Sequence, residues 1–304
     1  MLKEISCSIV PRVIITDSCS LLYASSKDGI YIDDVKLGDF PDCIQSHHFG
    51  FQDTSLNTEY VSFNCTHWNN DDEKEMGLTC YVVRIKDMKI QPNFVDKKIL
   101  DRNFLYSATL NPCMPLLTLA TNSKLTSINV ETGTTMDQTE LKCSDGLFYS
   151  KSGHHIIIIN PTPDISIVDS LTLKIKNIIK LPDSQKRFCA QMSPDNKMLL
   201  VDDYPINSNK NQVHLVECAT GKIQHTFIGF EKWIDGVAIS NNGNELTIID
   251  RSKKVQVWDV RNYHNTLKQY SLQNTLLTNS FRYMPNDESV LYQDWQGKIF
   301  IHKS

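Results

Sequence analysis

The sequence lacks the features that mark several protein classes. Its nine cysteines include no Cys-x-x-Cys pair, and the residues after Met1 contain no apolar stretch of signal-peptide length. The longest aliphatic run, residues 156–159, is far shorter than the roughly 20 residues that a membrane-spanning helix needs. We therefore expect reduced thiols, no membrane insertion and a cytoplasmic or nuclear location.

Concentrated basic charge is also missing. The formal net charge is −4 and the pI about 6.1, and no run of lysine or arginine exceeds a pair such as Lys97-Lys98. Because phosphate neutralisation supplies much of the affinity of nucleic-acid-binding proteins, nucleic acid is not expected as a partner. Helical periodicity is missing as well, since no amphipathic helix of three turns can be found.

Short strands with one apolar face are present throughout the chain. The clearest is residues 254–261 (KVQVWDVR), in which valines alternate with polar residues as a half-buried strand requires. Similar segments recur at residues 29–35, 80–87, 124–133, 164–170, 212–221 and 298–303.

These segments recur with a nearly constant period. The residues aligned with Asp259 are separated by 50, 45, 40, 48, 42 and 44 positions. They are Asp34, Arg84, Asn129, Asp169, Glu217, Asp259 and Lys303. A period of about 40–45 residues is typical of the four-stranded blade of a β-propeller. The spacing predicts an all-β, seven-bladed propeller that forms a single domain over residues 1–304.

One repeat carries a family resemblance. Val257-Trp258-Asp259, together with the preceding segment Gly229–Ser240, resembles a WD40 repeat. Phe230 stands where the family has a structural histidine, and only this repeat keeps a Trp-Asp pair. The resemblance extends over the whole chain and implies four-stranded antiparallel blades. It also implies a ring closed by the N-terminal strand, within Met1–Cys7, which would complete the last blade. An array of β-sandwiches is the structural alternative.

The resemblance also implies a docking face. WD40-like proteins bind partners on the face that holds the connection into each innermost strand and the turn between the second and third strands. Aligning the blades places a set of aromatic and charged residues there, and large aromatics are enriched at interface hot spots. The predicted partner-binding residues are Trp233, Asp235, Lys186, Phe188, Phe104, Tyr106, Asp145, Trp68 and Trp295. The alternative is that these rings pack within their own blades.

Two longer segments are expected as loops on the same face. Residues 67–79 are acidic and rich in asparagine, and residues 202–212 contain a proline and several asparagines. Insertions in a repeat usually lie on its binding side, and the acidity favours a basic partner. The alternative is a pair of solvated loops without a role.

Sequence motifs of catalysis are absent. The chain has no Gly-x-Ser-x-Gly elbow, phosphate-binding glycine loop or His-Glu-x-x-His pair. Cys43 with His47-His48 and Cys65 with His67 are the nearest approach to a metal site. Adjacent histidines on a strand point to opposite faces, so we predict no metal, no cofactor and no catalytic residue.

The sequence therefore favours a non-catalytic protein-protein interaction module: a scaffold, adaptor or complex subunit that binds a protein or peptide on the loop-rich face. The alternatives are a hydrolase or lyase with a site in the central channel, a purely structural subunit, and a secreted pathogen effector that acts inside host cells. The identity of the partner, the pathway, the source organism and the oligomeric state are left open.

Overall fold

The structure is a computed structural model that describes most of the chain after residue 104. The described residues are 3–5, 13–15, 21–25, 29–32, 35–38, 50–56, 60–68, 76–84, 89–90, 105–121, 123–141, 146–160, 164–181, 190–204, 211–230, 232–272, 281–294 and 298–303. Before residue 107, the side chains described are those of Tyr60, Ser62, Val82 and Arg84.

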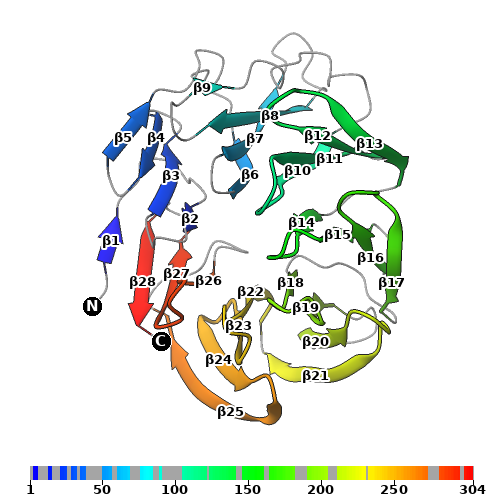
Figure 1. The fold of residues 1–304 in the computed structure, drawn as a ribbon. Helices are drawn as coiled ribbons and strands as arrows, with labels where there is room; N and C mark the ends of the chain where they lie inside the picture. Colours follow the sequence, from blue (N-terminus) through cyan, green and yellow to red (C-terminus); the bar gives the residue numbers. More distant parts are fainter. Residues whose placement is uncertain are drawn as a thin grey trace.

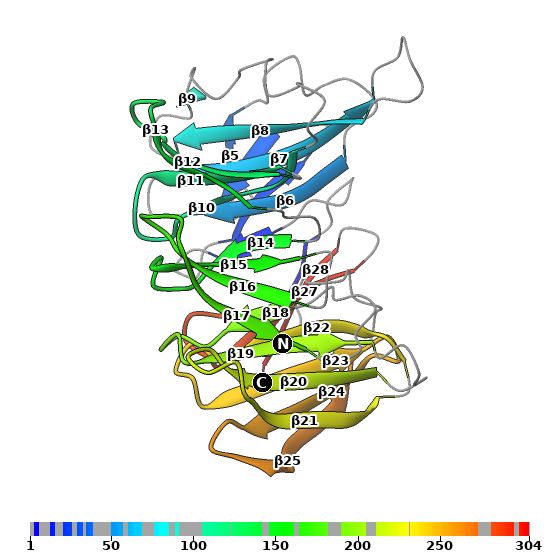
Figure 2. The same ribbon diagram turned by 90° about the vertical axis from the view of Figure 1, so that its right-hand side faces the viewer.

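The described strands pair into four-stranded antiparallel sheets, and consecutive strands are neighbours within each sheet. Figure 1 shows the sheets following one another around a common centre. The first strands, such as β10 and β14, lie nearest to that centre, and the fourth strands, such as β13 and β17, lie at the periphery. In the side view the strands of successive sheets are stacked above one another (Figure 2). The chain is therefore all-β, as the sequence predicts.

The bounds of the strands follow the sheet order. Along the chain, the first sheet contains β2 (Val13–Ile15), β3 (Leu21–Ser25), β4 (Gly29–Ile32) and β5 (Val35–Gly38). The next contains β6 (Gly50–Leu56), β7 (Tyr60–Trp68), β8 (Met76–Arg84) and β9 (Lys89–Ile90). The one after it contains β10 (Leu105–Leu110), β11 (Leu116–Thr121), β12 (Lys124–Asn129) and β13 (Thr135–Glu140). A further sheet contains β14 (Gly146–Tyr149), β15 (His155–Ile159), β16 (Asp164–Asp169) and β17 (Ile175–Lys180). It is followed by the sheet of β18 (Ala190–Met192), β19 (Met198–Asp203), β20 (Asn211–Glu217) and β21 (Ile223–Phe230). The last two sheets contain β22 (Ile234–Ile239), β23 (Glu245–Asp250), β24 (Lys254–Asp259) and β25 (Asn262–Ser271); and β26 (Arg282–Tyr283), β27 (Ser289–Gln293), β28 (Ile299–Lys303) and β1 (Lys3–Ile5).

Burial within a sheet falls from the second strand to the fourth. Second strands such as β15 and β23 are buried along nearly their whole length and have continuous apolar runs. The third strand β24 alternates between buried and half-buried residues, whereas the fourth strand β25 is exposed along most of its length. A strand covered on both faces needs apolar residues at every position, and a peripheral strand does not.

The hydrophobic core consists of layers between neighbouring sheets. Phe227 and Phe230 of β21 pack with Trp258 of β24, with the Phe227 and Trp258 ring centroids 4.8 Å apart. Comparable layers join the sheets on either side. Hydrogen bonds add to two of these contacts, because Thr118 bonds to Tyr149 and Thr247 to Tyr283 at equivalent places between sheets. Burial raises the pKa of Tyr149 to about 12.

The Asn and Asp residues among the repeat markers are explained by turn chemistry. Six of them end the third strand of their sheets: Arg84, Asn129, Asp169, Glu217, Asp259 and Lys303, whereas Asp34 lies outside the described residues. The Asn129 Oδ1 accepts the backbone N–H of Glu131 at 2.8 Å, and the Asp169 Oδ1 accepts that of Thr172 at 2.9 Å. A short polar side chain in this place fixes the turn into the fourth strand. The recurring Asp is therefore a structural residue.

The two expected loops are shorter than the sequence predicts. Residues 67–68 and 76–79 belong to β7 and β8, and Trp68 pairs with Met76. Residues 202–203 belong to β19, and 211–212 to β20. The strands extend further because hairpin pairing satisfies backbone groups that polar sequence alone does not assign to a strand. The remaining parts, 69–75 and 205–210, lie outside the described residues.

Candidate interaction surface

The structure describes four of the nine predicted partner-binding residues. Trp233 and Asp235 are described in full, and for Tyr106 in β10 and Trp68 in β7 the backbone alone is described. Lys186, Phe188, Phe104, Asp145 and Trp295 lie outside the described residues. Trp68 was expected in a loop and is instead the last residue of a strand, because β7 continues to pair with β8 up to that position.

Trp233 is a large aromatic side chain at the surface. It directly precedes β22, the first strand of its sheet, and is 51% exposed. The backbone of Trp233 is fixed by a hydrogen bond, because the Arg251 N–H donates to the Trp233 carbonyl oxygen at 2.7 Å. The exposed ring therefore stands on a fixed backbone.

Tyr204 fixes the same place from the neighbouring sheet. It directly follows β19, and its hydroxyl accepts the N–H of Ile234 at 3.0 Å and donates to the Ile234 carbonyl at 3.2 Å. The ring centroids of Tyr204 and Trp233 are 5.0 Å apart with an interplanar angle of 37°. Residues of two sheets therefore contact the indole of Trp233, and these contacts restrict its side-chain conformations.

Arg251 lies beside Trp233 because of the strand register. Ile234 pairs with Asp250 across β22 and β23, so the residues just beyond them meet. The Asp250 Oδ1 accepts the N–H of Ser252 at 3.0 Å, which shapes the turn that presents Arg251. The Arg251 Cζ is 5.8 Å from the Trp233 ring centroid, within the range of a cation–π contact.

Asp235 lies below this pair, where the sequence places a surface residue near the channel mouth. It is 1% exposed, and its Oδ1 accepts the Arg251 Nε at 3.2 Å. Asp235 stands at the register irregularity between Ile234 and Gly236, in a strand that is buried along its whole length, so a partner meets the exposed arginine before the aspartate. We name Tyr204, Trp233, Asp235 and Arg251 the Trp233 cluster.

Comparisons with known proteins place this geometry in a known fold. No protein-family profile and no curated protein sequence matches the chain. Two similar solved structures are the β-propeller domain of Cps50 (Swd1) from Myceliophteria thermophila and a chain of the mitotic checkpoint complex. The first has a TM-score of 0.73 and 14% identity over 99% of this chain and 98% of that one. The second has a TM-score of 0.74 and 9% identity over 99% and 91%. The chain has a WD40-like β-propeller fold.

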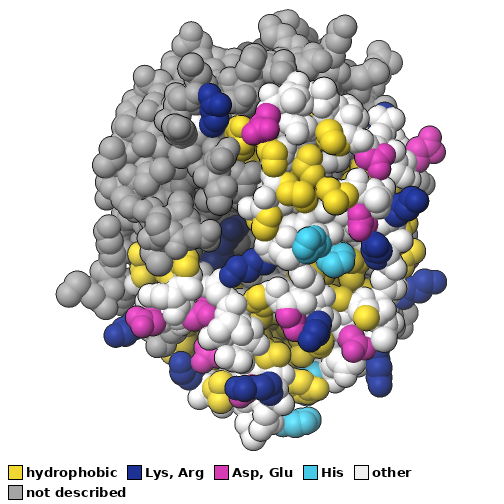
Figure 3. Space-filling view, in the orientation of Figure 1, with side chains coloured by type: hydrophobic (Ala, Val, Ile, Leu, Met, Phe, Trp, Pro, Cys, Tyr) yellow, Lys and Arg dark blue, Asp and Glu magenta, His cyan; other side chains and the backbone are white. Residues whose placement is uncertain are grey.

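The opposite end of the propeller's sheets carries the turns between first and second strands. There the polar side chains of one turn hydrogen-bond to another sheet, with distances of 2.8 to 3.2 Å. Consecutive sheets are bonded through Asn111–Gly153, Ser152–Asn196 and Asn241–Asp287, whereas Lys151–Asn241 links the sheets of β14 and β22, between which the sheet of β18 follows in chain order. These side chains are used in joining sheets. Over the face seen in Figure 3, described side chains of both charges are interspersed.

A buried polar network lies within one sheet of the propeller. The His214 Nε2 is 3.0 Å from the Asp203 Oδ2, and its Nδ1 is 3.0 Å from the Thr226 Oγ1. His214 and Asp203 are both buried, on adjacent strands β20 and β19. Although this order of groups resembles a catalytic triad, burial keeps a substrate away from it. Its role is to link the second, third and fourth strands.

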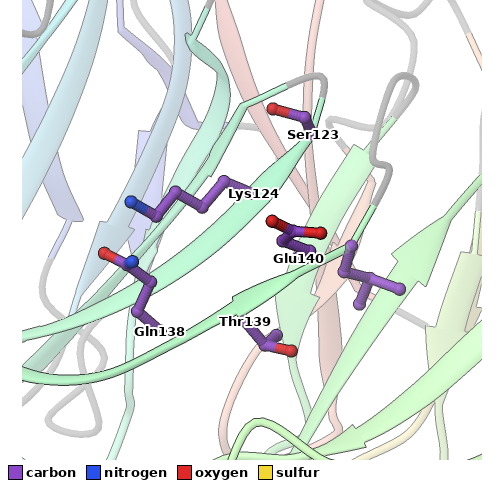
Figure 4. A pocket seen from close by; sticks show the side chains of 6 residues that line it. Ser123, Lys124, Gln138, Thr139 and Glu140 are labelled. Atoms are coloured by element: carbon purple, nitrogen blue, oxygen red, sulfur yellow. The ribbon is translucent and has the colours of Figure 1, made fainter.

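A hollow of about 600 Å³ lies beside the peripheral strand β13, on a sheet other than those of the Trp233 cluster. Figure 4 shows Lys124, Gln138 and Glu140 around it. Its remaining lining residues are Ser123, Thr139 and Leu141. It contains no pair of nucleophile and histidine base, and its acidic and basic groups are balanced.

Metal ligands do not gather in the part of the propeller that the structure describes, where no group of three His, Cys, Asp or Glu side chains is found. The side chains of Cys43, His47, His48, Cys65 and His67 lie outside that part. The described segments likewise include no helix with the length and hydropathy to cross a bilayer.

Proposed function

We propose that this protein is a non-catalytic interaction module, built as one closed propeller of seven blades over residues 1–304, that binds a protein or peptide at the Trp233 cluster. The described strands supply seven four-stranded sheets in support of this count. The observation that carries the binding site is the 51% exposure of a tryptophan whose backbone and neighbours are fixed from two sheets. Exposed, preorganised aromatics are typical interface anchors because they bury much area at little entropic cost.

The similar structures support a role in assembly. One of them is a chain of the mitotic checkpoint complex, a protein that works as part of a complex. We propose the same kind of role here, as scaffold, adaptor or complex subunit. The remaining predicted residues, among them Phe104 and Lys186, would extend the binding surface around the same face.

The proposed closure of the ring depends on one strand pairing. β1 pairs antiparallel with β28, with Glu4 opposite Phe300, so the first residues of the chain supply the fourth strand of the last sheet. Deleting residues 1–7 should expose two strand edges and lower the melting temperature strongly or cause aggregation. Lys3→Ala, which keeps the backbone pairing, is the control. A truncated protein that melts with the full-length chain would refute closure by this strand.

The binding site is tested with two tryptophans of one sheet. A partner is isolated from native cytosol with the full-length chain as bait, and its affinity is then measured with purified proteins. Trp233→Ala should weaken binding by about 2 kcal/mol or more and cost less than about 1 kcal/mol of stability. Trp258→Ala, the control, removes a ring that is 6% exposed and should cost about 3–5 kcal/mol of stability. If Trp233→Ala destabilises the fold and leaves affinity intact, the proposed site is wrong.

A further inference from the structure

The chemistry of the partner follows from how charge is arranged in the Trp233 cluster. In the segments 232–235 and 250–254 the cationic residues are Lys232, Arg251, Lys253 and Lys254, and the anionic residues are Asp235 and Asp250. The two carboxylates are 1% and 3% exposed, whereas the Arg251 side chain is 49% exposed. A partner approaching these segments therefore meets positive charge.

Asp235 already has its counter-ion. Its Oδ1 lies 3.2 Å from the Arg251 Nε, and a partner lysine or arginine could replace that contact only by entering a buried position. Removing a cation from water costs several kcal/mol before any attraction is gained. The basic partner that the acidic loop sequences favour is therefore disfavoured at this cluster.

Arg251 is oriented for an incoming anion. Asp235 engages only its Nε, and the guanidinium makes no second ion pair within the described residues. The Nη groups retain donors that can hold both oxygens of a carboxylate in a planar fork. The Trp233 ring, 5.8 Å away, restricts the guanidinium further and offers an apolar face to whatever side chain stands beside the anion.

We propose that the Trp233 cluster binds an acidic peptide: a glutamate or aspartate side chain pairs with the Arg251 guanidinium, and a neighbouring aromatic or aliphatic side chain packs on the Trp233 ring. Asp235 acts as a positioning residue that orients the guanidinium and does not touch the partner. This inference rests on the proposed function and adds the chemical class of the partner.

The test selects peptides from a phage-displayed library of random twelve-residue sequences on the full-length protein. The selected peptides should contain Asp or Glu next to an aromatic or aliphatic residue. Replacing that acidic residue with Lys should abolish binding. Arg251→Gln should weaken the synthetic peptides at least about tenfold, as expected for a charged hydrogen bond, and Arg251→Lys should recover part of the loss. Asp235→Asn should weaken them less than Arg251→Gln does.

The outcomes separate this inference from the proposed function. Peptides rich in Lys or Arg whose binding depends on Trp233 would overturn the acidic partner and leave the binding site standing. Peptides that bind the Trp233→Ala and Arg251→Gln variants as well as the wild type would overturn both. A library that yields no binding peptide would overturn the acidic-peptide inference. Tighter binding when phosphoserine replaces the selected acidic residue would overturn the assignment of a carboxylate.

Discussion

The two ends of the sheets use polar and aromatic residues in different ways. At the end with the first-to-second-strand turns, side chains such as Asn111 and Asn241 hydrogen-bond to the next sheet. At the other end, Trp233 and Arg251 remain half exposed although Tyr204 and Asp235 fix them in place. One end is built to join sheets, and the other has rigid groups whose exposure the fold does not require. Fixed and exposed groups are what a binding surface needs.

The contrast also separates two tryptophans of the same sheet. Trp258 packs between Phe227 and Phe230 in the layer between two sheets, and it is 6% exposed. Trp233 has an equal ring and is 51% exposed. Burying an aromatic side chain stabilises a fold by several kcal/mol, so an exposed one at a fixed position gives up that gain. Binding a partner is the process that would recover it.

Substitutions in the turns between first and second strands should lower stability and leave partner affinity unchanged. Gly153→Ala should show the largest effect. Gly153 has φ of +73°, and a Cβ there would lie 2.4 Å from the Asn111 Oδ1. Left-handed strain and displacement of a buried asparagine should together cost about 2–3 kcal/mol, measured as a shift in the urea midpoint. Affinity for the peptides that bind the Trp233 cluster should be unchanged.

Gly243→Ala is the matched control for this contact. Gly243 holds the same turn position in another sheet with φ of +75°, but its nearest neighbour would be the Pro194 Cδ at 3.9 Å. Only the backbone strain remains, so a cost of about 1 kcal/mol is expected. Equal costs for the two variants would show that the Asn111–Gly153 bond does not join the sheets, and the contrast between the two ends would lose its basis.

The sequence predicts the strands and turns well because their signals are local. The spacing of the markers places Asn129, Asp169 and Asp259 at the ends of third strands, since each forms a turn with the residues that follow it. The exposure of Trp233 is likewise predicted by its place before a first strand.

The rest of the site depends on contacts between distant residues. Arg251 was not predicted, because only the register that pairs Ile234 with Asp250 brings it to Trp233. Arg251 could have been identified from the sequence only by first aligning the two predicted antiparallel strands in this register. Tyr204 was assigned to a loop, and its bonds to Ile234 join two sheets over 30 positions. The burial of Asp235 reflects a first strand that neighbouring elements cover along its whole length, which no local pattern shows.

A smaller effect than that of Gly153→Ala concerns the acid sensitivity of the turn between the third and fourth strands that contains Asp169. Hydrogen bonds from Thr172 and Leu171 and the Lys176 ammonium at 3.3 Å lower the pKa of Asp169 from 3.8 to about 2. A carboxyl whose pKa is lowered by folding contributes stability that is fully present well above its ordinary pKa and is lost as the pH falls towards the folded value. Because solvent screens part of these interactions, Asp169 should contribute no more than about 1–2 kcal/mol at pH 6, and most of this should disappear between pH 4 and about pH 2.

Asp169→Asn is the variant that measures this contribution, because Asn129 shows that an amide accepts the same turn bonds in another sheet. The variant should melt below the wild type at pH 6, and the difference between their melting temperatures should shrink steadily as the pH falls to 2.5. A difference that stays constant with pH would mean that the ionised carboxylate contributes nothing beyond its geometry. Because Asp169 lies in the turn between β16 and β17, on a sheet that contributes no residue to the Trp233 cluster, peptide affinity at pH 7 should match the wild type. A loss of affinity in this variant would show that the two ends of the sheets are coupled and that binding is not confined to the Trp233 cluster.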